Sequence, residues 1–189
     1  MKKKIVNSIK EKSIMLKDVK EKAKKYTIIN EVALRNEVAV FGSTYLFNFP
    51  FYELMQGHIT DYAVYNRSIE GMKVSEAVEA VDDCLKNLDP AIILVSLGEE
   101  DDDSEETFIA YSELLKKIRA AHRSAKIYVM QTFGKDGEFC DKVKAVAERN
   151  GVEYVEVGNE EKIKSVFARL SAYFHRSGIS FSDAFGVGC

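Results

Sequence analysis

Three short segments, far apart in the sequence, carry the side chains that could do chemistry. They are Gly42-Ser43-Thr44, residues 66–71 and residues 98–101. A serine or threonine hydroxyl can attack a carbonyl carbon only if a neighbouring base removes its proton. Ser43 and Thr44 could instead cap the segment that follows them, as such residues commonly do. Because all three segments combine glycine with polar side chains, they are the candidates for a functional site.

Strand-like and helix-like patterns alternate along the chain and would position these segments. Short apolar or β-branched runs predict strands at 37–41, 61–65, 91–97, 126–132 and 152–157. Apolar residues at helical spacing predict helices at 73–88, 103–122, 138–150 and 160–174, and Asp103 with Glu106 has the spacing of a capping box. This alternation predicts βαβ units. We therefore expect an α/β fold, namely a three-layer α/β/α sandwich with a roughly five-stranded parallel sheet of the flavodoxin-like type.

The three polar segments follow the first three predicted strands, and sites in such sheets form beyond the carboxyl ends of the strands. Their order and spacing resemble the SGNH (GDSL-type) hydrolase family of esterases, lipases and acylhydrolases. Residues 65–71, Tyr-Asn-Arg-Ser-Ile-Glu-Gly, are similar to the family's Asn-Arg-Gly-Ile-x-Gly block. Residues 94–101 stand where the family has Gly-x-Asn-Asp. The resemblance extends from about residue 38 to the carboxyl terminus and implies the SGNH hydrolase fold.

The resemblance assigns roles to the first two segments. In that family, a serine after the first strand attacks an ester carbonyl, and its backbone amide, a glycine and an asparagine stabilise the oxyanion. The family's Phe-Gly-Asp-Ser block corresponds to residues 41–44, and Pro50 matches a proline downstream. A gapless match places Thr44 at the nucleophile position, whereas a shift of one residue places Ser43 there. Gly71 matches the oxyanion glycine.

The resemblance places Glu100 at the position of the oxyanion asparagine. A carboxylate accepts hydrogen bonds and repels an oxyanion, whereas an amide donates. Glu100 lies in an acidic run, residues 99–106, that contains seven carboxylates. A protonated Glu100 could still donate, and the run could bind a cation. The run lacks calcium-loop spacing, so we expect no metal site and favour a solvated, acidic start of a helix.

The family's base and its orienting aspartate, in an Asp-x-x-His pattern near the carboxyl terminus, are also replaced. The matching residues are Ser177-Gly178-Ile179-Ser180, so Ser177 stands for the aspartate and Ser180 for the histidine. The histidines are elsewhere, at His58, His122 and His175, and only a shifted alignment would bring His175 to the site. Loss of the base and its orienter predicts a loss of activity of several orders of magnitude.

The amino-terminal segment is basic, whereas the rest of the chain is acidic. Residues 1–25 hold ten lysines and three acidic residues, a net charge of +7, and the remainder has a net charge of −10. Apolar residues at roughly helical spacing, such as Ile5, Ile9 and Val19, predict a helix with one face on the body, across the sheet or against its edge. The lysines lack interleaved aromatic residues for stacking on nucleic acid. We expect residues 1–28 to form a basic helical extension of a domain at 29–189, with no nucleic-acid partner.

Composition sets the broad class. The chain has 189 residues, 46% of them hydrophobic, and only two prolines, which excludes disordered and collagen-like proteins. No apolar run is long enough to span a membrane and no secretory signal is recognisable, so the expected location is cytoplasmic. Cys84, Cys140 and Cys189 are expected to be reduced thiols. The sequence predicts no cofactor.

Together these residues predict an SGNH hydrolase-like protein whose catalytic set is lost. Such a protein would be a non-catalytic homologue that binds a small-molecule ligand in the vestigial cleft. Two alternatives stay open. One is an active esterase or acylhydrolase that uses Ser43 or Thr44 with His175 or a carboxylate as base. The other is an interaction module whose Lys-rich helix recognises an acidic partner or a membrane.

Overall fold

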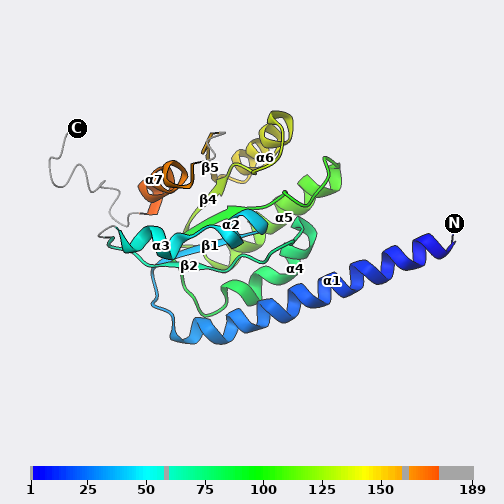
Figure 1. Ribbon diagram of the computed structural model, residues 1–189, viewed down its shortest axis with the longest axis horizontal. Coiled ribbons are helices and arrows are strands. Elements are labelled where there is room, and N and C mark those ends of the chain that lie inside the picture. The colour runs from blue at the N-terminus through cyan, green and yellow to red at the C-terminus, as the bar shows by residue number, and fades with distance from the viewer. Residues whose placement is uncertain (1, 58–59, 159–161, 175–189) are drawn as a thin grey trace.

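The computed structural model describes residues 2–57, 60–158 and 162–174, with the backbone alone for residues 2–15. Five strands alternate with helices along the chain (Figure 1). The strands are β1 (Val38–Gly42), β2 (Val64–Asn66), β3 (Ile92–Ser96), β4 (Lys126–Met130) and β5 (Glu153–Val155). The helices are α1 (Lys2–Ile29), η1 (Asn30–Val32), α2 (Thr44–Asn48), α3 (Phe51–Gln56), α4 (Val74–Leu85), α5 (Glu105–Ala121), α6 (Gly137–Arg149) and α7 (Ile163–Phe174).

The five strands form one sheet in the order β2-β1-β3-β4-β5, and every pair in it is parallel. Strand β1 is central to the site because it pairs with β2 on one side and with β3 on the other. Parallel strands must be covered on both faces, and β1 and β3 are buried along their whole length. The predicted α/β fold with a five-stranded parallel sheet is confirmed.

Alternate residues of the strands supply two separate cores. Ala39 and Phe41 of β1 pack in the core beneath α4, α5 and α6. Val38 and Val40 of the same strand pack in the opposite core, beneath α2, α3 and α7. This alternation is the period of two that a strand imposes on its side chains. The result is the predicted three-layer sandwich.

The basic helix α1 packs beside α4 and so extends the helical layer that α4, α5 and α6 form (Figure 1). Val19 and Ala23, one helical turn apart, are its buried contacts. Lys20 forms an exposed ion pair with Glu79 of α4 at 3.1 Å. Tyr26 of α1 also donates to the carbonyl oxygen of Ser68, in the loop after the edge strand β2, which agrees with the expectation that α1 lies against one edge of the sheet.

Other differences from the sequence-based prediction are local. Helices α2 and α3 were not predicted, since each is about one turn long and carries little periodicity. Helix α5 is preceded by Ser104 as its N-cap, so the capping box predicted at Asp103 is wrong. Cys84 and Cys140 are free and buried. None of the helices in the described ranges is long and apolar enough to cross a membrane.

Candidate functional site

The site lies where β1, β2 and β3 end, because all three strands run in the same direction. The turn after β1 begins at Gly42, and the space there admits no side chain. A Cβ atom at Gly42 would lie 2.4 Å from the carbonyl oxygen of Ser96 in β3. This close approach of two strand ends holds the turn that carries Thr44 against the loop that carries Glu100.

Thr44 bridges the second and third polar segments. Its Oγ1 accepts a hydrogen bond from the backbone N–H of Gly71 at 3.0 Å and donates one to Oε1 of Glu100 at 2.8 Å. Gly71 has φ = +74°, the left-handed conformation that glycine adopts most readily, and this conformation orients its N–H. The structure therefore brings together three residues that the gapless match assigned to one site.

Ser43 is placed differently from Thr44. Its side chain is completely buried, and its Oγ has no hydrogen-bond partner among the described residues. Its backbone N–H donates to the carbonyl oxygen of Ser96 at 3.2 Å, which continues the pairing of β1 with β3. Thr44, not Ser43, is the hydroxyl that meets Gly71 and Glu100.

Glu99 is a second carboxylate at the site. Its Oε2 accepts a hydrogen bond from the backbone N–H of Tyr45 at 2.7 Å, near the start of α2, while its buried Oε1 has no partner among the described residues. The pKa of Glu99 is raised to about 7, chiefly by burial; the Tyr45 N–H opposes this shift and the neighbouring Glu100 adds to it. Two adjacent carboxylates thus face the turn after β1 from the end of β3.

Other carboxylates of the acidic run contact the helices around the site. Both carboxylate oxygens of Asp101 accept from the backbone N–H of Val74, at 3.1 and 3.3 Å, at the first residue of α4. Burial raises the pKa of Asp101, an effect that this hydrogen bond opposes. Asp103 pairs with Lys142 of α6. The run therefore satisfies N–H groups at the starts of two helices, α2 through Glu99 and α4 through Asp101, which explains why its carboxylates point in different directions.

No metal centre is formed by these carboxylates. Across residues 2–57, 60–158 and 162–174, no group of three or more His, Cys, Asp or Glu side chains is arranged to hold a metal ion. Glu100 is directed to Thr44 and Asp101 to α4. Their separate hydrogen bonds leave the run without a shared point for a cation.

An aromatic pair flanks the site. The rings of Tyr45 and Phe133 are stacked, with centroids 3.6 Å apart and planes 10° from parallel. Phe133 comes from the loop after β4, so a fourth strand end contributes to the surroundings of Thr44. Burial raises the pKa of Tyr45 to about 12, with a smaller contribution from Glu99, so its hydroxyl is neutral at physiological pH.

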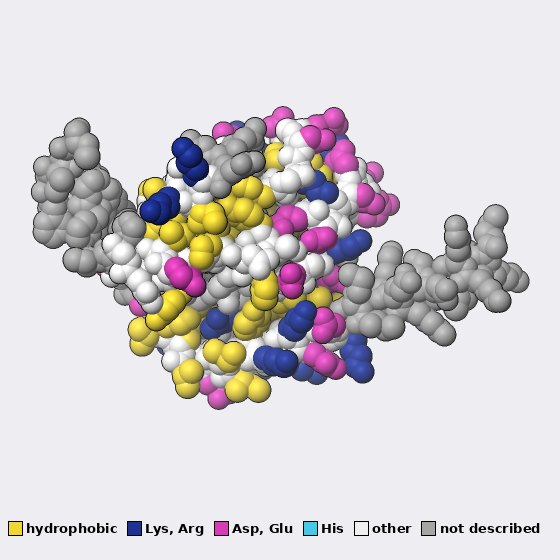
Figure 2. Space-filling view, in the orientation of Figure 1, with side chains coloured by type: hydrophobic (Ala, Val, Ile, Leu, Met, Phe, Trp, Pro, Cys, Tyr) yellow, Lys and Arg dark blue, Asp and Glu magenta, His cyan; other side chains and the backbone are white. Residues whose placement is uncertain are grey.

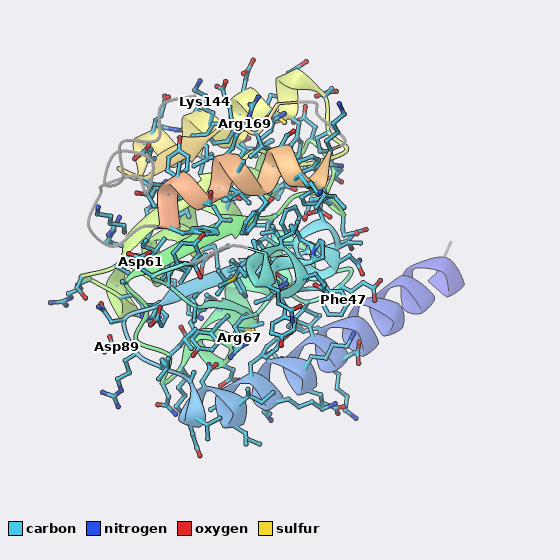
Figure 3. The ribbon with its side chains drawn as sticks, turned by 60° about the vertical axis from the view of Figure 1, so that its left-hand side comes forward. Phe47, Asp61, Arg67, Asp89, Lys144 and Arg169 are labelled. Carbon is cyan, nitrogen blue, oxygen red and sulfur yellow. The ribbon has the colours of Figure 1, made fainter. Side chains whose placement is uncertain are left out.

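The loop that carries Gly71 is anchored from below by α1 and η1. Arg67 is buried, and its Nε donates to Oδ1 of Asn30 at 2.7 Å. The rings of Tyr26 and Tyr65 lie on either side of this interaction, 5.2 and 5.4 Å from the guanidinium carbon. Figure 3 shows Arg67 on the side of the molecule where α1 lies, with Lys144 and Arg169 on the opposite side.

Three further hydrogen bonds fix the same loop. Tyr26 donates from its hydroxyl to the carbonyl oxygen of Ser68 at 2.7 Å. Asn66 donates from its side-chain amide to the carbonyl oxygen of Leu46 in α2 at 2.7 Å, and its Oδ1 accepts from the N–H of Ser68. These hydrogen bonds connect the loop before Gly71 to α1 through Tyr26 and to α2 through Leu46.

The remaining predicted residues are not part of this cluster. Ser177, Ser180, His58 and His175 lie outside the described residues. His122 is described and follows α5, just before the start of β4, so it lies at the amino-terminal ends of the strands, whereas Thr44 lies at their carboxyl ends. Burial lowers the pKa of His122, so it is neutral there at physiological pH. It cannot reach Thr44.

Sequence reasoning named Glu99 and Asp101 only as charged neighbours and overlooked Tyr45 and Phe133. The roles of these residues depend on contacts between segments more than 25 positions apart, such as Glu99 with Tyr45 and Asp101 with Val74. A signal existed only for the acidic run, whose charge density was visible. The aromatic pair carries no motif in the sequence.

The arrangement is poorly suited to stabilising an oxyanion. The Gly71 N–H already donates to Thr44, and Glu100 presents an acceptor where a donor is required. The same geometry favours a ligand that donates hydrogen bonds or carries positive charge, since carboxylates accept and attract.

No protein-family model and no curated protein sequence matches the chain. Several solved structures match it in fold. A protein from Streptococcus pneumonia, described as a platelet activating factor, is 14% identical with a TM-score of 0.71, over 90% of this chain and 99% of that one. A GDSL-like lipase from Bacteroides thetaiotaomicron is 14% identical with a TM-score of 0.60, over 79% of this chain and 93% of that one.

A psychrotrophic esterase from Pseudoalteromonas sp. is similar as well. It is 16% identical with a TM-score of 0.53, over 64% of this chain and 76% of that one. Identities at this level establish a shared fold and leave function to the site itself. With its five parallel strands, its two helical layers and these neighbours, the chain has the fold of the SGNH (GDSL-type) hydrolases.

Proposed function

We propose that this chain is a non-catalytic protein of the SGNH hydrolase fold that binds a small polar or cationic ligand beside Thr44, Gly71 and Glu100. One observation carries the proposal. Glu100 accepts a hydrogen bond from Thr44 at 2.8 Å, so a carboxylate occupies the place that the resemblance assigns to an oxyanion donor. A negative group there opposes the charge that develops in ester hydrolysis.

Two further features support the proposal. The second carboxylate, Glu99, adds negative potential when ionised, and the stacked Tyr45–Phe133 pair provides an aromatic wall beside it. Carboxylates combined with aromatic rings suit an ammonium group, which is attracted to both. Ser177 and Ser180, which replace the family's orienter and base in the sequence, remove the expected means of activating a hydroxyl.

The sign of the ligand's charge provides the test. A site that stabilises an oxyanion binds small anions, whereas the site proposed here binds cations. We expect choline to raise the melting temperature of the protein, and acetate at equal ionic strength to leave it unchanged. The increase should disappear in Glu100→Gln, which removes the charge but keeps the size. Stabilisation by acetate and not by choline would contradict the proposal.

One observation favours a second candidate, an esterase with a rewired site. The hydrogen bond from Thr44 to Glu100 has the geometry of a nucleophile beside a base, and a carboxylate can act as a general base. In that case Glu100 would take the proton of the Thr44 hydroxyl as its oxygen attacks the ester carbonyl. This candidate predicts ester turnover that depends on Thr44, whereas ligand binding alone predicts none.

A further inference from the structure

Helix α1 extends beyond the rest of the molecule. Lys20 pairs with Glu79 of α4, and the hydroxyl of Thr27 donates to the carbonyl oxygen of Asp83 at 2.8 Å, so the two helices run in the same direction. Moving from Glu79 back to the first residue of α4, Val74, corresponds to moving from Lys20 to about Met15. The backbone of α1 continues from there to Lys2, roughly 20 Å farther at 1.5 Å per residue (Figure 1).

The projecting part of α1 leaves the body at the end of the molecule that carries the acidic run, beyond the carboxyl ends of the strands. The N-terminus of α4 lies at this end, since Val74 donates to Asp101. Figure 2 shows acidic side chains gathered on the side from which α1 extends. Residues 2–15 contain five lysines and one glutamate, whereas residues 99–106 contain seven carboxylates and no basic residue. The chain therefore carries two segments of opposite charge near one end of the molecule.

Few of these carboxylates form an ion pair within one molecule, although Lys73 and Lys135 attract Asp101 from nearby. Among the residues whose side chains are described, Asp103 is the only member of the run with an ion pair, formed with Lys142. Glu100, Asp102, Glu105 and Glu106 are exposed. The described lysines of α1 that form ion pairs, Lys20 and Lys22, do so with Glu79 and Asp18, and not with the acidic run.

We propose that the projecting part of α1 docks on the acidic run of a second copy of this chain. A straight helix that points away from its own body cannot reach the acidic run of the same molecule, but it can reach the acidic run of another molecule. A two-fold axis would pair each basic helix with the other copy's acidic run, so both contacts form together. This charge complementarity is what favours a second copy over a nucleic acid or a membrane. The inference does not depend on the proposed ligand.

The dimer places each basic helix beside the partner's candidate site. Glu100 is part of the acidic run and also holds Thr44. Docking therefore brings positive charge close to the carboxylates of the partner's site. Dimer formation and the binding of a cationic ligand then compete for these carboxylates.

Sedimentation velocity of the full chain tests the inference. We expect a dimer at low ionic strength that dissociates at high ionic strength, because contacts between exposed charges are screened by salt. Lys3→Glu with Lys4→Glu should raise the dissociation constant more than about tenfold, since attraction becomes repulsion at both contacts. Lys24→Glu with Lys25→Glu makes the same change in net charge beside α4, where the helix does not project, and should leave the dimer intact.

A charge swap makes the test specific. Glu105→Lys with Glu106→Lys should also abolish the dimer, and a chain that carries both pairs of reversals should recover it. A wild-type chain that is monomeric at low ionic strength would overturn the inference, as would a dimer indifferent to Lys3→Glu with Lys4→Glu. Binding of the monomer to phosphatidylserine vesicles or to DNA, lost in that variant, would overturn it in favour of another partner.

Discussion

Thr44 lies between a donor and an acceptor, and this placement defines the site at the scale of single residues. Gly71 donates to its hydroxyl oxygen, and the hydroxyl proton is directed to Glu100. In a hydrolase of this fold, the resemblance assigns donors to both Gly71 and the position of Glu100. Here one donor is engaged by Thr44 and the other position is an acceptor. Under the proposed function, the carboxylate at position 100 reverses the electrostatic preference that an amide would give the site.

Glu99 makes the stability of the protein depend on pH. Its folded-state pKa is about 7, above the ordinary value of 4.5, so between these values the folded state holds a proton that the unfolded state has released. Stability from this group is therefore present below about pH 4.5 and is lost as pH rises towards 7 and beyond. We expect Glu99→Gln to raise the melting temperature relative to wild type above pH 7, and to have little effect at pH 4.5.

A thermal melt of both proteins across this pH range measures the difference. Glu113→Gln, at an exposed position of α5, controls for the loss of one negative charge. An equal effect of Glu99→Gln at both ends of the pH range would show that Glu99 is not held in its neutral form by burial.

At the scale of elements, α1 is bound to the loop of the site through Asn30. This side chain is buried at the end of α1, where its amide donates to the carbonyl oxygens of Cys84 and Lys86 and its oxygen accepts from Arg67. Removing it leaves one buried guanidinium N–H and two carbonyl oxygens without partners. We expect Asn30→Ala to lower the free energy of unfolding by about 3 kcal/mol, since each unsatisfied buried group costs roughly 1–3 kcal/mol.

Urea denaturation measures this loss. Asn48→Ala is the matched control, because Asn48 is exposed and its amide donates only to the carbonyl oxygen of Thr44 one turn earlier. The control should change the free energy of unfolding by less than about 0.5 kcal/mol. Equal effects of the two substitutions would mean that α1 is not anchored through Asn30.

The elements were predictable to the extent that local patterns determine them. The buried run of β3 and the apolar stripe of α4 are typical of a strand and a helix. The alternation of such segments along the chain predicts a parallel sheet. The ends of elements were less predictable: Asp103 was expected to cap α5, yet Ser104 precedes it. The start of α4 combines a local and a distant contact. The carboxylate of Glu76 accepts from the N–H of Lys73 three residues earlier, whereas Asp101 in another loop accepts from the N–H of Val74, a contact that no local pattern encodes.

At the scale of the whole molecule, the topology of the sheet explains which site residues the sequence could identify. Thr44, Gly71 and Glu100 each follow a strand in a parallel sheet, so a match in chain order was sufficient to group them. Tyr45 and Phe133 meet through side-chain packing between α2 and the loop after β4, which depends on the finished fold. The direction of α1 likewise depends on the buried contacts of Val19 and Ala23 with the α4 layer.

The molecule as a whole combines the fold of the SGNH hydrolases with a site for which we propose a preference for positive charge. Fold and function separate here because the layers of the sandwich are set by buried apolar residues, whereas the site is set by a few side chains at the ends of strands. The position of Glu100, to which the resemblance assigns an amide, lies beyond β3, which ends at Ser96, so a carboxylate there leaves the strand unaffected.

Hydrolysis of p-nitrophenyl acetate is the measurement that tests the central claim most directly. The wild-type chain is compared with Thr44→Val, which keeps the shape of the side chain without its hydroxyl, and with Ser43→Ala. We predict a rate equal to that of buffer for all three proteins, because the groups that activate a nucleophile and stabilise the oxyanion act as a unit. Turnover well above buffer in the wild type that disappears in Thr44→Val would contradict the account and establish the rewired esterase.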